Sequence, residues 1–229
     1  MDSMNFFDAI YCICMDDRPQ KRKRLFGQIH SHFPDWNPTL FPAISTRYLK
    51  NHHIGCALSH RSVIQEAKEK NYKNILVFEE DAVFHRDFKK HLIRNLKELK
   101  TIPWDILYLG ACVWNPKPPE NPRVFEPVLN CGKLKILTKS TCTQALAYNH
   151  TCYDYILNSL PNTVKKMTEW CKQHAAIDQW LMYKMQGSGS VKDGLRQFNC
   201  YITEPRICSQ PFLIGGNKQD KPFDFHDKS

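Results

Sequence analysis

The sequence predicts an α/β fold with a mostly parallel central sheet and helices on both of its faces. Short apolar runs typical of buried strands alternate with segments in which apolar residues recur at helical spacing. These helical segments have roughly ten residues or more, the length that a crossover between parallel strands needs. A chain of 229 residues with 42% hydrophobic and 24% charged content can build a core of this kind.

The first half of the chain alternates most regularly. Its strands are unbroken apolar runs, as in 75–78 (ILVF), which is the type of strand that is buried. Its helices carry an apolar face, as formed by Leu92, Leu96 and Leu99. In chain order, the expected elements are a strand at 7–15, a helix at 21–31, a strand at 39–44, a helix at 59–70, a strand at 74–78, a helix at 88–100 and a strand at 105–110.

The second half is less regular. We expect its elements to pack onto the same sheet, so that residues 1–217 form a single domain and 218–229 a polar C-terminal tail. The proline-rich segment 114–123 is the obvious long loop. In chain order, the expected elements of this half are a strand at 144–148, a helix at 151–160, a helix at 175–185 and a strand at 199–203.

The charge balance favours an anionic partner. Lysine and arginine total 32 against 23 aspartates and glutamates, a surplus of nine. Nucleic acid, a membrane surface and a phosphorylated small molecule are all open on this ground alone. The densest basic run, 18–24 (RPQKRKR), is of a kind that is more often a solvated helix face than a binding site.

Three features favour a cytoplasmic location. There is no run of about 18 apolar residues, so we expect no transmembrane segment. The N-terminus has an acid at position 2 and no basic n-region, unlike a secretory signal. The ten cysteines are scattered without a C-x-x-C pair, and we expect most of them to be reduced thiols.

Three acids follow the strand at 74–78 directly, in the sequence NILVFEEDAVF. Because side chains alternate along a strand, Glu79 and Asp81 are expected on one side and Glu80 on the other. Two carboxylates about 5 Å apart repel by roughly 3 kcal/mol at an effective dielectric constant near 20. Protonation, pairing with Lys or Arg, or a divalent cation offsets such repulsion, and a solvated polar turn is the alternative without function.

The position of these acids favours a ligand site. They lie at the carboxyl end of a strand, which is where open α/β sheets bind ligands. Carboxylate oxygens suit Mg²⁺ or Mn²⁺, whose coordination is commonly completed by substrate phosphates. Such a metal recruits a diphosphate and neutralises it as a leaving group.

The sequence around these acids resembles glycosyltransferase family 25, which includes bacterial lipooligosaccharide galactosyltransferases and collagen galactosyltransferases. Gly55, Cys56, Ser59 and His60 match its Gly-Cys-x-x-Ser-His segment, and 77–81 (VFEED) matches the strand ending in its Glu-Asp-Asp version of the D-x-D motif. Further similar segments, in the family's order, are IYCICMDDRPQKRKRL, DILYLG, TQALAYNHTCYDYIL, AIDQWLM and EPRICSQPF.

The resemblance implies a GT-A fold and transfer of a hexose, galactose or glucose, from a UDP-sugar with inversion. The acceptor would be a hydroxyl of a glycan, glycolipid or protein. The resemblance also implies Mn²⁺ or Mg²⁺ at Asp81 and Glu79, where Asp81 would bind the metal that holds both phosphates and Glu79 would reach a metal-bound water or the ribose. Arg18, Ser59 and His60 are further candidates for contacts with the donor. Ser59 as a helix cap, His60 as an interior histidine and Arg18 on a solvated helix face are the alternatives.

Inverting transfer also needs a base that takes the proton of the acceptor hydroxyl. Asp178 is the candidate catalytic base, since a carboxylate between Ile177 and Trp180 at an apolar helix start gains basicity from partial burial. N-terminal capping of that helix is the structural alternative.

Two other function classes compete with a transferase. A phosphohydrolase or nuclease also uses clustered acids and a metal, but no acid-x-Lys pair follows the strand and no basic-aromatic nucleic-acid motif is visible. A degenerate, non-catalytic binding protein would be favoured by loss of the acids, which are present. We therefore expect a nucleotide sugar and an acceptor as partners, and no nucleic acid.

Overall fold

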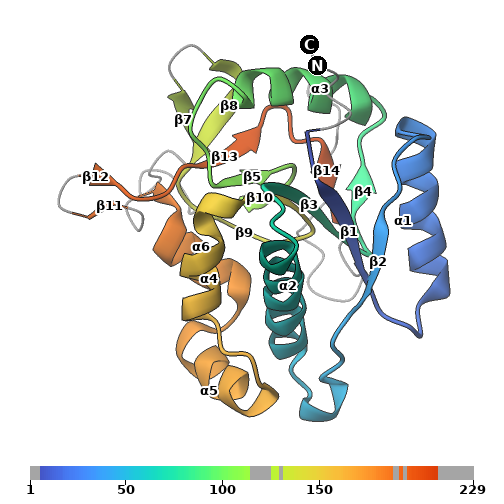
Figure 1. Cartoon of the computed structure of the whole chain (residues 1–229), viewed down its shortest axis with the longest axis vertical. Coiled ribbons are helices and arrows are strands. Elements are labelled where there is room, and N and C mark those ends of the chain that lie inside the picture. Colours follow the sequence, from blue (N-terminus) through green and yellow to red (C-terminus); the bar gives the residue numbers. More distant parts are fainter. Residues whose placement is uncertain (1–5, 114–124, 129–130, 188–190, 193–194, 211–229) are drawn as a thin grey trace, which may run out of the picture.

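An eight-stranded sheet forms the centre of the protein (Figure 1). The structure, a computed structural model, describes residues 6–113, 125–128, 131–187, 191–192 and 195–210. In spatial order, the strands of the sheet are β2 (Thr39–Pro42), β1 (Ala9–Cys14), β3 (Asn74–Glu79), β10 (Ala145–Asn149), β5 (Ile106–Tyr108), β13 (Cys200–Thr203), β8 (Cys131–Leu137) and β7 (Phe125–Val128).

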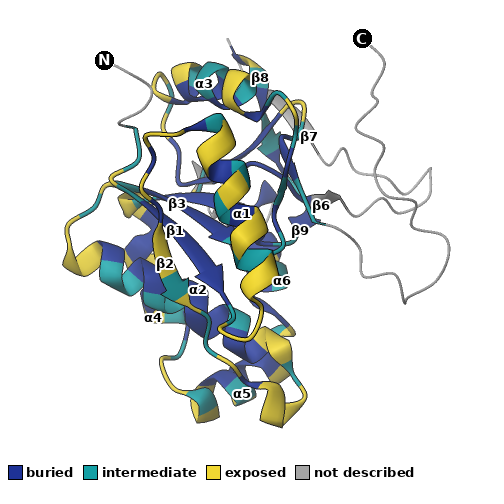
Figure 2. Cartoon of the chain, turned by 90° about the vertical axis from the view of Figure 1, so that its right-hand side faces the viewer, coloured by how far each residue is buried: buried dark blue, intermediate teal, exposed yellow. Residues whose placement is uncertain are grey.

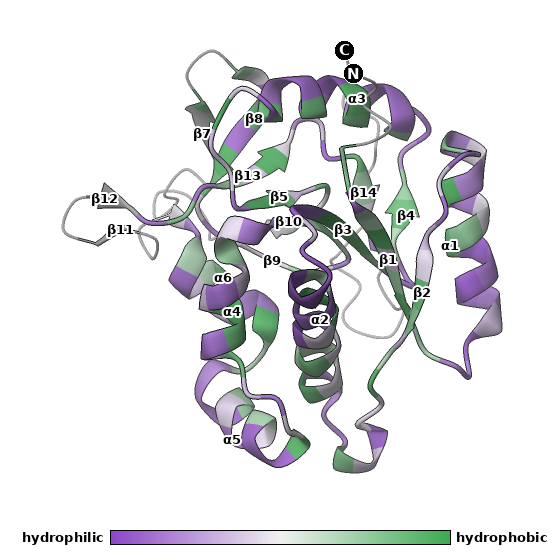
Figure 3. Cartoon of the chain, in the orientation of Figure 1, coloured by the Kyte–Doolittle hydropathy of each residue, from purple (hydrophilic) through white to green (hydrophobic). Residues whose placement is uncertain are grey.

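Six of these eight strands run in one direction, whereas β10 and β8 run antiparallel to both of their neighbours. The expected mostly parallel sheet is therefore confirmed, with two reversed strands. The strands of the second half, β10 and β13, belong to the same sheet as those of the first half. β1 and β3 are mostly apolar along their length (Figure 3), as strands covered on both faces must be.

Helices cover both faces of the sheet, as the sequence predicts (Figure 1). Two separate clusters of buried side chains show this, because β3 sends Leu76 and Phe78 into one and Ile75 and Val77 into the other. The first cluster includes residues of α1 (Pro19–His32) and α3 (Phe88–Leu99). The second includes residues of α2 (His52–Glu69), α4 (Tyr153–Ser159), α5 (Val164–His174) and α6 (Ile177–Met185). Figure 2 shows the buried strands between helices whose outer sides are exposed.

Short elements complete the described residues. β14 pairs antiparallel with β4 and brings the end of the described chain beside the loop that follows β3. The short elements are the 3₁₀ turns η2 (Arg47–Leu49) and η3 (His150–Cys152) and the strands β4 (Val83–Phe84), β6 (Cys112–Val113), β9 (Ser140–Thr141), β11 (Val191–Lys192), β12 (Leu195–Arg196) and β14 (Cys208–Ser209).

The structure differs from the expected elements at the start of α2 and in three elements of the second half. α2 begins at His52 rather than at Ser59, because the side chain of Asn51 caps it by accepting a hydrogen bond from the His53 amide. Gly55 lies inside this helix, where a Cβ atom would stand 2.1 Å from the carbonyl oxygen of Ile44. The sequence reading also missed α5 and the antiparallel strands β7 and β8. The expected loop at 114–123 and the tail at 218–229 lie outside the described residues.

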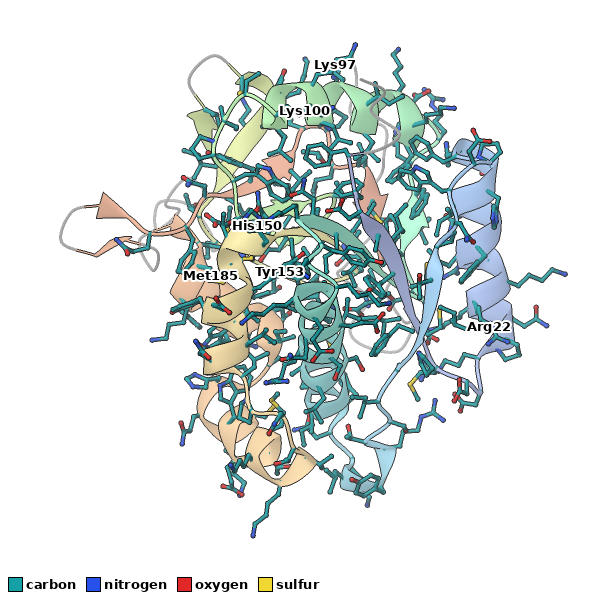
Figure 4. All side chains as sticks on the ribbon, in the orientation of Figure 1. Arg22, Lys97, Lys100, His150, Tyr153 and Met185 are labelled. Atoms are coloured by element: carbon teal, nitrogen blue, oxygen red, sulfur yellow. The ribbon has the colours of Figure 1, made fainter. Side chains whose placement is uncertain are left out.

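The basic residues are spread over separate helices. Figure 4 shows Lys97 and Lys100 at the end of α3 and Arg22 on α1. Lys23 and Arg24 are exposed, as expected for a solvated helix face. Among the described helices, none combines the length and apolar character that crossing a membrane requires.

Most of the described cysteines are free thiols, in line with the sequence reading. Cys142 is an exception, because it is disulfide-bonded. The free cysteines are Cys12, Cys14, Cys56, Cys131, Cys152, Cys171, Cys200 and Cys208.

Gly110 allows the last described segment to reach the sheet. A Cβ atom at this position would stand 1.8 Å from the carbonyl oxygen of Cys208, whose own amide bonds to Leu109. We expect Gly110→Ala to lower the free energy of unfolding by about 3 kcal/mol, because backbone on both sides must move. Urea denaturation measures this difference.

Gly27→Ala is the matched control. Gly27 lies inside α1, and a Cβ atom there would meet nothing within 4 Å. Because alanine favours a helix more than glycine does, the free energy of unfolding should rise by roughly 0.5–1 kcal/mol. Equal effects of the two substitutions would show that the contact with Cys208 does not constrain position 110.

Candidate active site

The three acids after β3 divide as strand alternation predicts. Glu80 turns toward α1, where its carboxylate accepts hydrogen bonds from Arg18 Nη1 at 2.7 Å and from the Met15 amide at 2.9 Å. Lys21 Nζ lies 3.6 Å from the same carboxylate, whose side chain is only 8% exposed. Glu80 therefore connects the start of α1 to the end of β3, and its role is structural.

Glu79 lies in a buried polar cluster on the other side. Its Oε1 accepts a hydrogen bond from Thr143 Oγ1 at 2.5 Å and lies 3.1 Å from His60 Nε2. The thiol of Cys56 lies 3.8 Å from the same oxygen. His60 is held from behind, because the Tyr148 hydroxyl lies 3.1 Å from its Nδ1.

The electrostatics of this cluster keep Glu79 ionised. Burial raises the pKa of Glu79, but the hydrogen bond and charge of His60, with the bonds of Thr143 and Cys56, outweigh it and lower the pKa below its ordinary value. A partly buried carboxylate that stays charged is a fixed negative group at the end of β3.

Asp81 has the opposite electrostatic character. Its Oδ2 accepts a hydrogen bond from Gln210, whereas its Oδ1 is buried without a hydrogen-bond partner among the described residues. Burial, and then the negative charge of Glu79, raise the pKa of Asp81. An unpartnered buried oxygen beside a second carboxylate fits a divalent cation. The cation would give the oxygen a partner and offset the repulsion between the two carboxylates.

Asp178 joins these acids from a distant part of the chain. It lies in the first turn of α6, and its Oδ2 accepts a hydrogen bond of 2.9 Å from the Cys142 amide. Its Oδ1 accepts one of 2.8 Å from the Gln179 amide. The expected helix start is confirmed, and the carboxylate is oriented by two N–H groups.

The thiol of Cys56 shows that the three carboxylates converge. Burial raises the pKa of this thiol well above its ordinary value, and Glu79, Asp178 and Asp81 each raise it further. All three acids therefore lie within electrostatic reach of this partly exposed thiol. Asp178 and Glu79 lie almost a hundred positions apart in the sequence, but they bond to the adjacent residues Cys142 and Thr143 at the carboxyl end of β3.

Ser59 and Arg18 bond to the scaffold around this point. Ser59 Oγ donates to the Gly55 carbonyl and accepts from the Ile44 amide, both at 2.8 Å, and so fixes the segment before α2. Arg18 pairs with Glu80, with 44% of its side chain exposed. A contact of either residue with the donor stays a prediction.

The sequence did not predict the contacts that three residues make with Glu79, His60 and Asp81. Thr143 and Tyr148 stand in TQALAY, a segment noted only for its resemblance, and Gln210 stands in EPRICSQPF. The sequence thus marked these residues only as members of segments that resemble the family. The contacts themselves, to Glu79, His60 and Asp81, depend on β10 and β14 lying beside β3 and β4, and strand order was not predicted.

A second cluster of potential metal ligands lies at the start of α3. His85, Asp87 and His91 have ligand atoms within 4.8 Å of one another. The Nδ1 of His85 accepts from the Asp87 amide, however, and Arg94 Nη2 lies 2.9 Å from His91 Nδ1. These contacts engage only the Nδ1 atoms, and both rings keep Nε2 as a possible ligand. We nevertheless place the candidate catalytic metal at Asp81, because the acids there lie at the carboxyl end of β3, where open α/β sheets bind ligands.

Comparison with known proteins points to one family. The model of "Glycosyltransferase family 25 (LPS biosynthesis protein)" matches residues 2–181. A rat protein called "Probable inactive glycosyltransferase 25 family member 3" is 29% identical over 136 residues, 48% of this chain and 24% of that protein. Human "Procollagen galactosyltransferase 2" is 35% identical over 139 residues, 50% of this chain and 22% of that protein.

Other similar proteins carry related names. "Procollagen galactosyltransferase 1-A" of Xenopus laevis is 37% identical over 146 residues, 53% of this chain and 24% of that protein. The chain thus spans about a quarter of the length of these curated relatives. A crystal structure of "a glycosyltransferase involved in the glycosylation of the major capsid of PBCV-1" aligns with a TM-score of 0.40 and 13% identity, over 73% of this chain and 75% of that chain.

Proposed function

The chain belongs to glycosyltransferase family 25, and from this premise we propose that it is a metal-dependent, inverting glycosyltransferase. It would move a hexose from a UDP-sugar to a hydroxyl group of a glycan, glycolipid or protein acceptor. The observation that carries this proposal is that the neighbouring residues Cys142 and Thr143 hydrogen-bond to Asp178 and Glu79, which brings Asp178 to the acids at the end of β3. Galactose is the first donor sugar to test, because relatives are named procollagen galactosyltransferases.

The donor side of the site is formed by Asp81 and Glu79. Asp81 offers an unpartnered buried oxygen to Mn²⁺ or Mg²⁺, and Glu79 is held ionised beside it. The metal would supply charge neutralisation for the diphosphate leaving group. His60 and Thr143 keep the Glu79 carboxylate in one orientation, so that the donor meets a fixed charge.

The acceptor side is formed by Asp178. Its carboxylate would take the proton of the acceptor hydroxyl while the hydroxyl oxygen bonds to the anomeric carbon. In the same step the bond from that carbon to the diphosphate oxygen breaks, on the opposite face, and the configuration inverts. The Cys142 and Gln179 amides orient the carboxylate for this transfer.

The test is a panel of nucleotide sugars incubated with the protein and Mn²⁺, with nucleotide release as the readout. Release from a UDP-hexose that stops when the metal is chelated supports the proposal. Calorimetry that detects no binding of any nucleotide sugar refutes it. Cleavage of nucleic acid or simple phosphate esters in the same buffer would indicate a phosphohydrolase.

A donor-binding protein without transferase activity is the second candidate. The names of several relatives favour it, since they include inactive members of the family. Its signature would be saturable binding of a nucleotide sugar with no release of nucleotide at any metal concentration. Calorimetry and the release assay together separate the two candidates.

A further inference from the structure

One short segment of the chain holds both sides of the candidate site. The Cys142 amide donates to Asp178 Oδ2 at 2.9 Å, and the next residue, Thr143, donates its hydroxyl to Glu79 Oε1 at 2.5 Å. A movement of residues 142–143 would therefore displace the candidate base relative to the donor-site carboxylate. Nothing in the sequence motifs gives Cys142 a role.

The segment is anchored on both sides of these two residues. On one side, the backbone of the buried Ser140 is bonded to the Gln186 side chain: its amide donates to Oε1 at 2.8 Å, and its carbonyl accepts from Nε2 at 3.1 Å. On the other side, the Gln144 carbonyl accepts from the Glu79 amide at 2.9 Å, where β10 begins. Residues 141–143 are thus a short bridge between two fixed points.

Cys142 itself has an unfavourable backbone conformation. Its φ angle is +77°, a region that residues with a Cβ atom rarely occupy unless their surroundings enforce it. Its side chain is disulfide-bonded, which supplies a covalent restraint at the centre of the bridge. In this conformation the amide points at Asp178.

We propose that the disulfide at Cys142 is the positioning device for the acceptor base. It holds residue 142 at positive φ, and thereby keeps its N–H group on Asp178 and the carboxylate aligned with the acceptor. Cys142 acts through Asp178 and is a positioning residue. The inference rests on the proposed function for its effect on turnover, but its structural part stands independently.

The proposal predicts sensitivity to thiol reductants. A dithiol reductant such as dithiothreitol gives two electrons and two protons to the disulfide, which yields two protein thiols and the cyclic disulfide of the reductant. Without the covalent restraint, residue 142 relaxes and its amide leaves Asp178. Oxidation that forms the disulfide again should restore the original alignment.

The first experiment compares Cys142→Ser with Cys171→Ser, which removes a free, buried thiol from α5. Cys142→Ser should lower kcat by about 10- to 100-fold, the effect of misplacing a catalytic group, with KM for the donor changed less than about twofold. Dithiothreitol should reproduce this loss in the wild type, reoxidation should reverse it, and neither should affect the variant further. Cys171→Ser should behave as the wild type does.

The second experiment needs no turnover. Hydrogen exchange of the Cys142 amide is slow while it donates to Asp178, so reduction of the wild type should accelerate exchange at this amide. Thermal unfolding of the reduced protein should stay cooperative, which shows that it is still folded. Unchanged exchange after reduction overturns the inference even if the protein transfers no sugar. Unchanged kcat on reduction of an active wild type also overturns it. If the protein releases no nucleotide from any donor but reduction accelerates exchange of the Cys142 amide, the proposed function is refuted and the structural part of the inference stands.

Discussion

Replacing Asp81 with Asn should abolish nucleotide release from a UDP-sugar while it raises the thermal stability of the metal-free protein. Loss of a carboxylate metal ligand removes several kcal/mol of charge stabilisation, so turnover should fall at least about 100-fold. The amide is neutral and can still accept the hydrogen bond of Gln210. Nucleotide release and differential scanning calorimetry measure the two effects.

The expected gain in stability follows from the raised pKa of Asp81. The folded protein holds this proton more tightly than the unfolded chain, so the free energy of unfolding is highest while Asp81 is protonated. This part of the free energy of unfolding is then lost as the pH rises from the ordinary aspartate pKa, about 4, through the raised pKa of Asp81. At neutral pH the variant avoids this loss, and Tm should rise by roughly 2–4 °C for each kcal/mol regained.

Metal addition gives the complementary result. Mn²⁺ should raise Tm of the wild type, because a ligand that binds only the folded state stabilises it, and should have little effect on Asp81→Asn. Glu80→Gln is the control, since its carboxylate bonds to Arg18 and Met15, and it should lose stability while it responds to metal as the wild type does. An equal metal response in Asp81→Asn would exclude Asp81 as a ligand.

Asp178→Asn should lower kcat by about 10²- to 10⁴-fold, the usual contribution of a general base. The affinity for the donor should stay within about twofold, because Asp178 is assigned to the acceptor side. Asn can keep one acceptor oxygen for the Cys142 amide, so the fold should not change. Steady-state kinetics and donor calorimetry measure the two quantities.

Asp154→Asn is the matched control for this substitution. Asp154 also lies in the first turn of a helix, α4, but its side chain is 71% exposed and pairs with Lys68. It shares the electrostatic interaction with the helix N-terminus and nothing of the candidate site. Equal losses in both variants would mean that Asp178 stabilises its helix and is not the base.

Local sequence patterns predicted the elements well where neighbours in the chain decide the structure. The apolar run of β3 and the spaced leucines of α3 are examples, and both elements lie within a residue of the expected ranges. The patterns failed where distant contacts decide. Gly55 discourages a helix locally, yet α2 includes it because Asn51 caps the helix further upstream. The nearby Ile44 carbonyl leaves no room for a Cβ atom, which explains the glycine at this position.

The candidate site shows the same limit. Alternation along β3 was sufficient to separate Glu80 from Glu79 and Asp81, because it is a property of one strand. The partners of these acids were not predictable, because Thr143 reaches Glu79 only through the antiparallel pairing of β10 with β3. The family resemblance marked the segments that carry these residues, but only the strand order of the structure shows that they lie side by side.

The disulfide at Cys142 bears on the expected cytoplasmic location. Stable disulfides are typical of oxidising compartments, whereas thiols in the cytosol are kept reduced. The eight free cysteines fit either setting, because seven of them are buried. The cytoplasmic location stays a prediction, and the disulfide favours an oxidising compartment.

The position of β10 also constrains the order in which the chain folds. β10 lies between β3 and β5, although both of these strands precede it in the sequence. During synthesis, β3 and β5 therefore keep unpaired edges until residue 149 has emerged. β8 and β7 join the sheet later still, because they connect to it only through β13. Such late, non-local pairing is slow and leaves apolar strand edges open to aggregation. A ribosome-bound chain ending before β10 should therefore depend on chaperones.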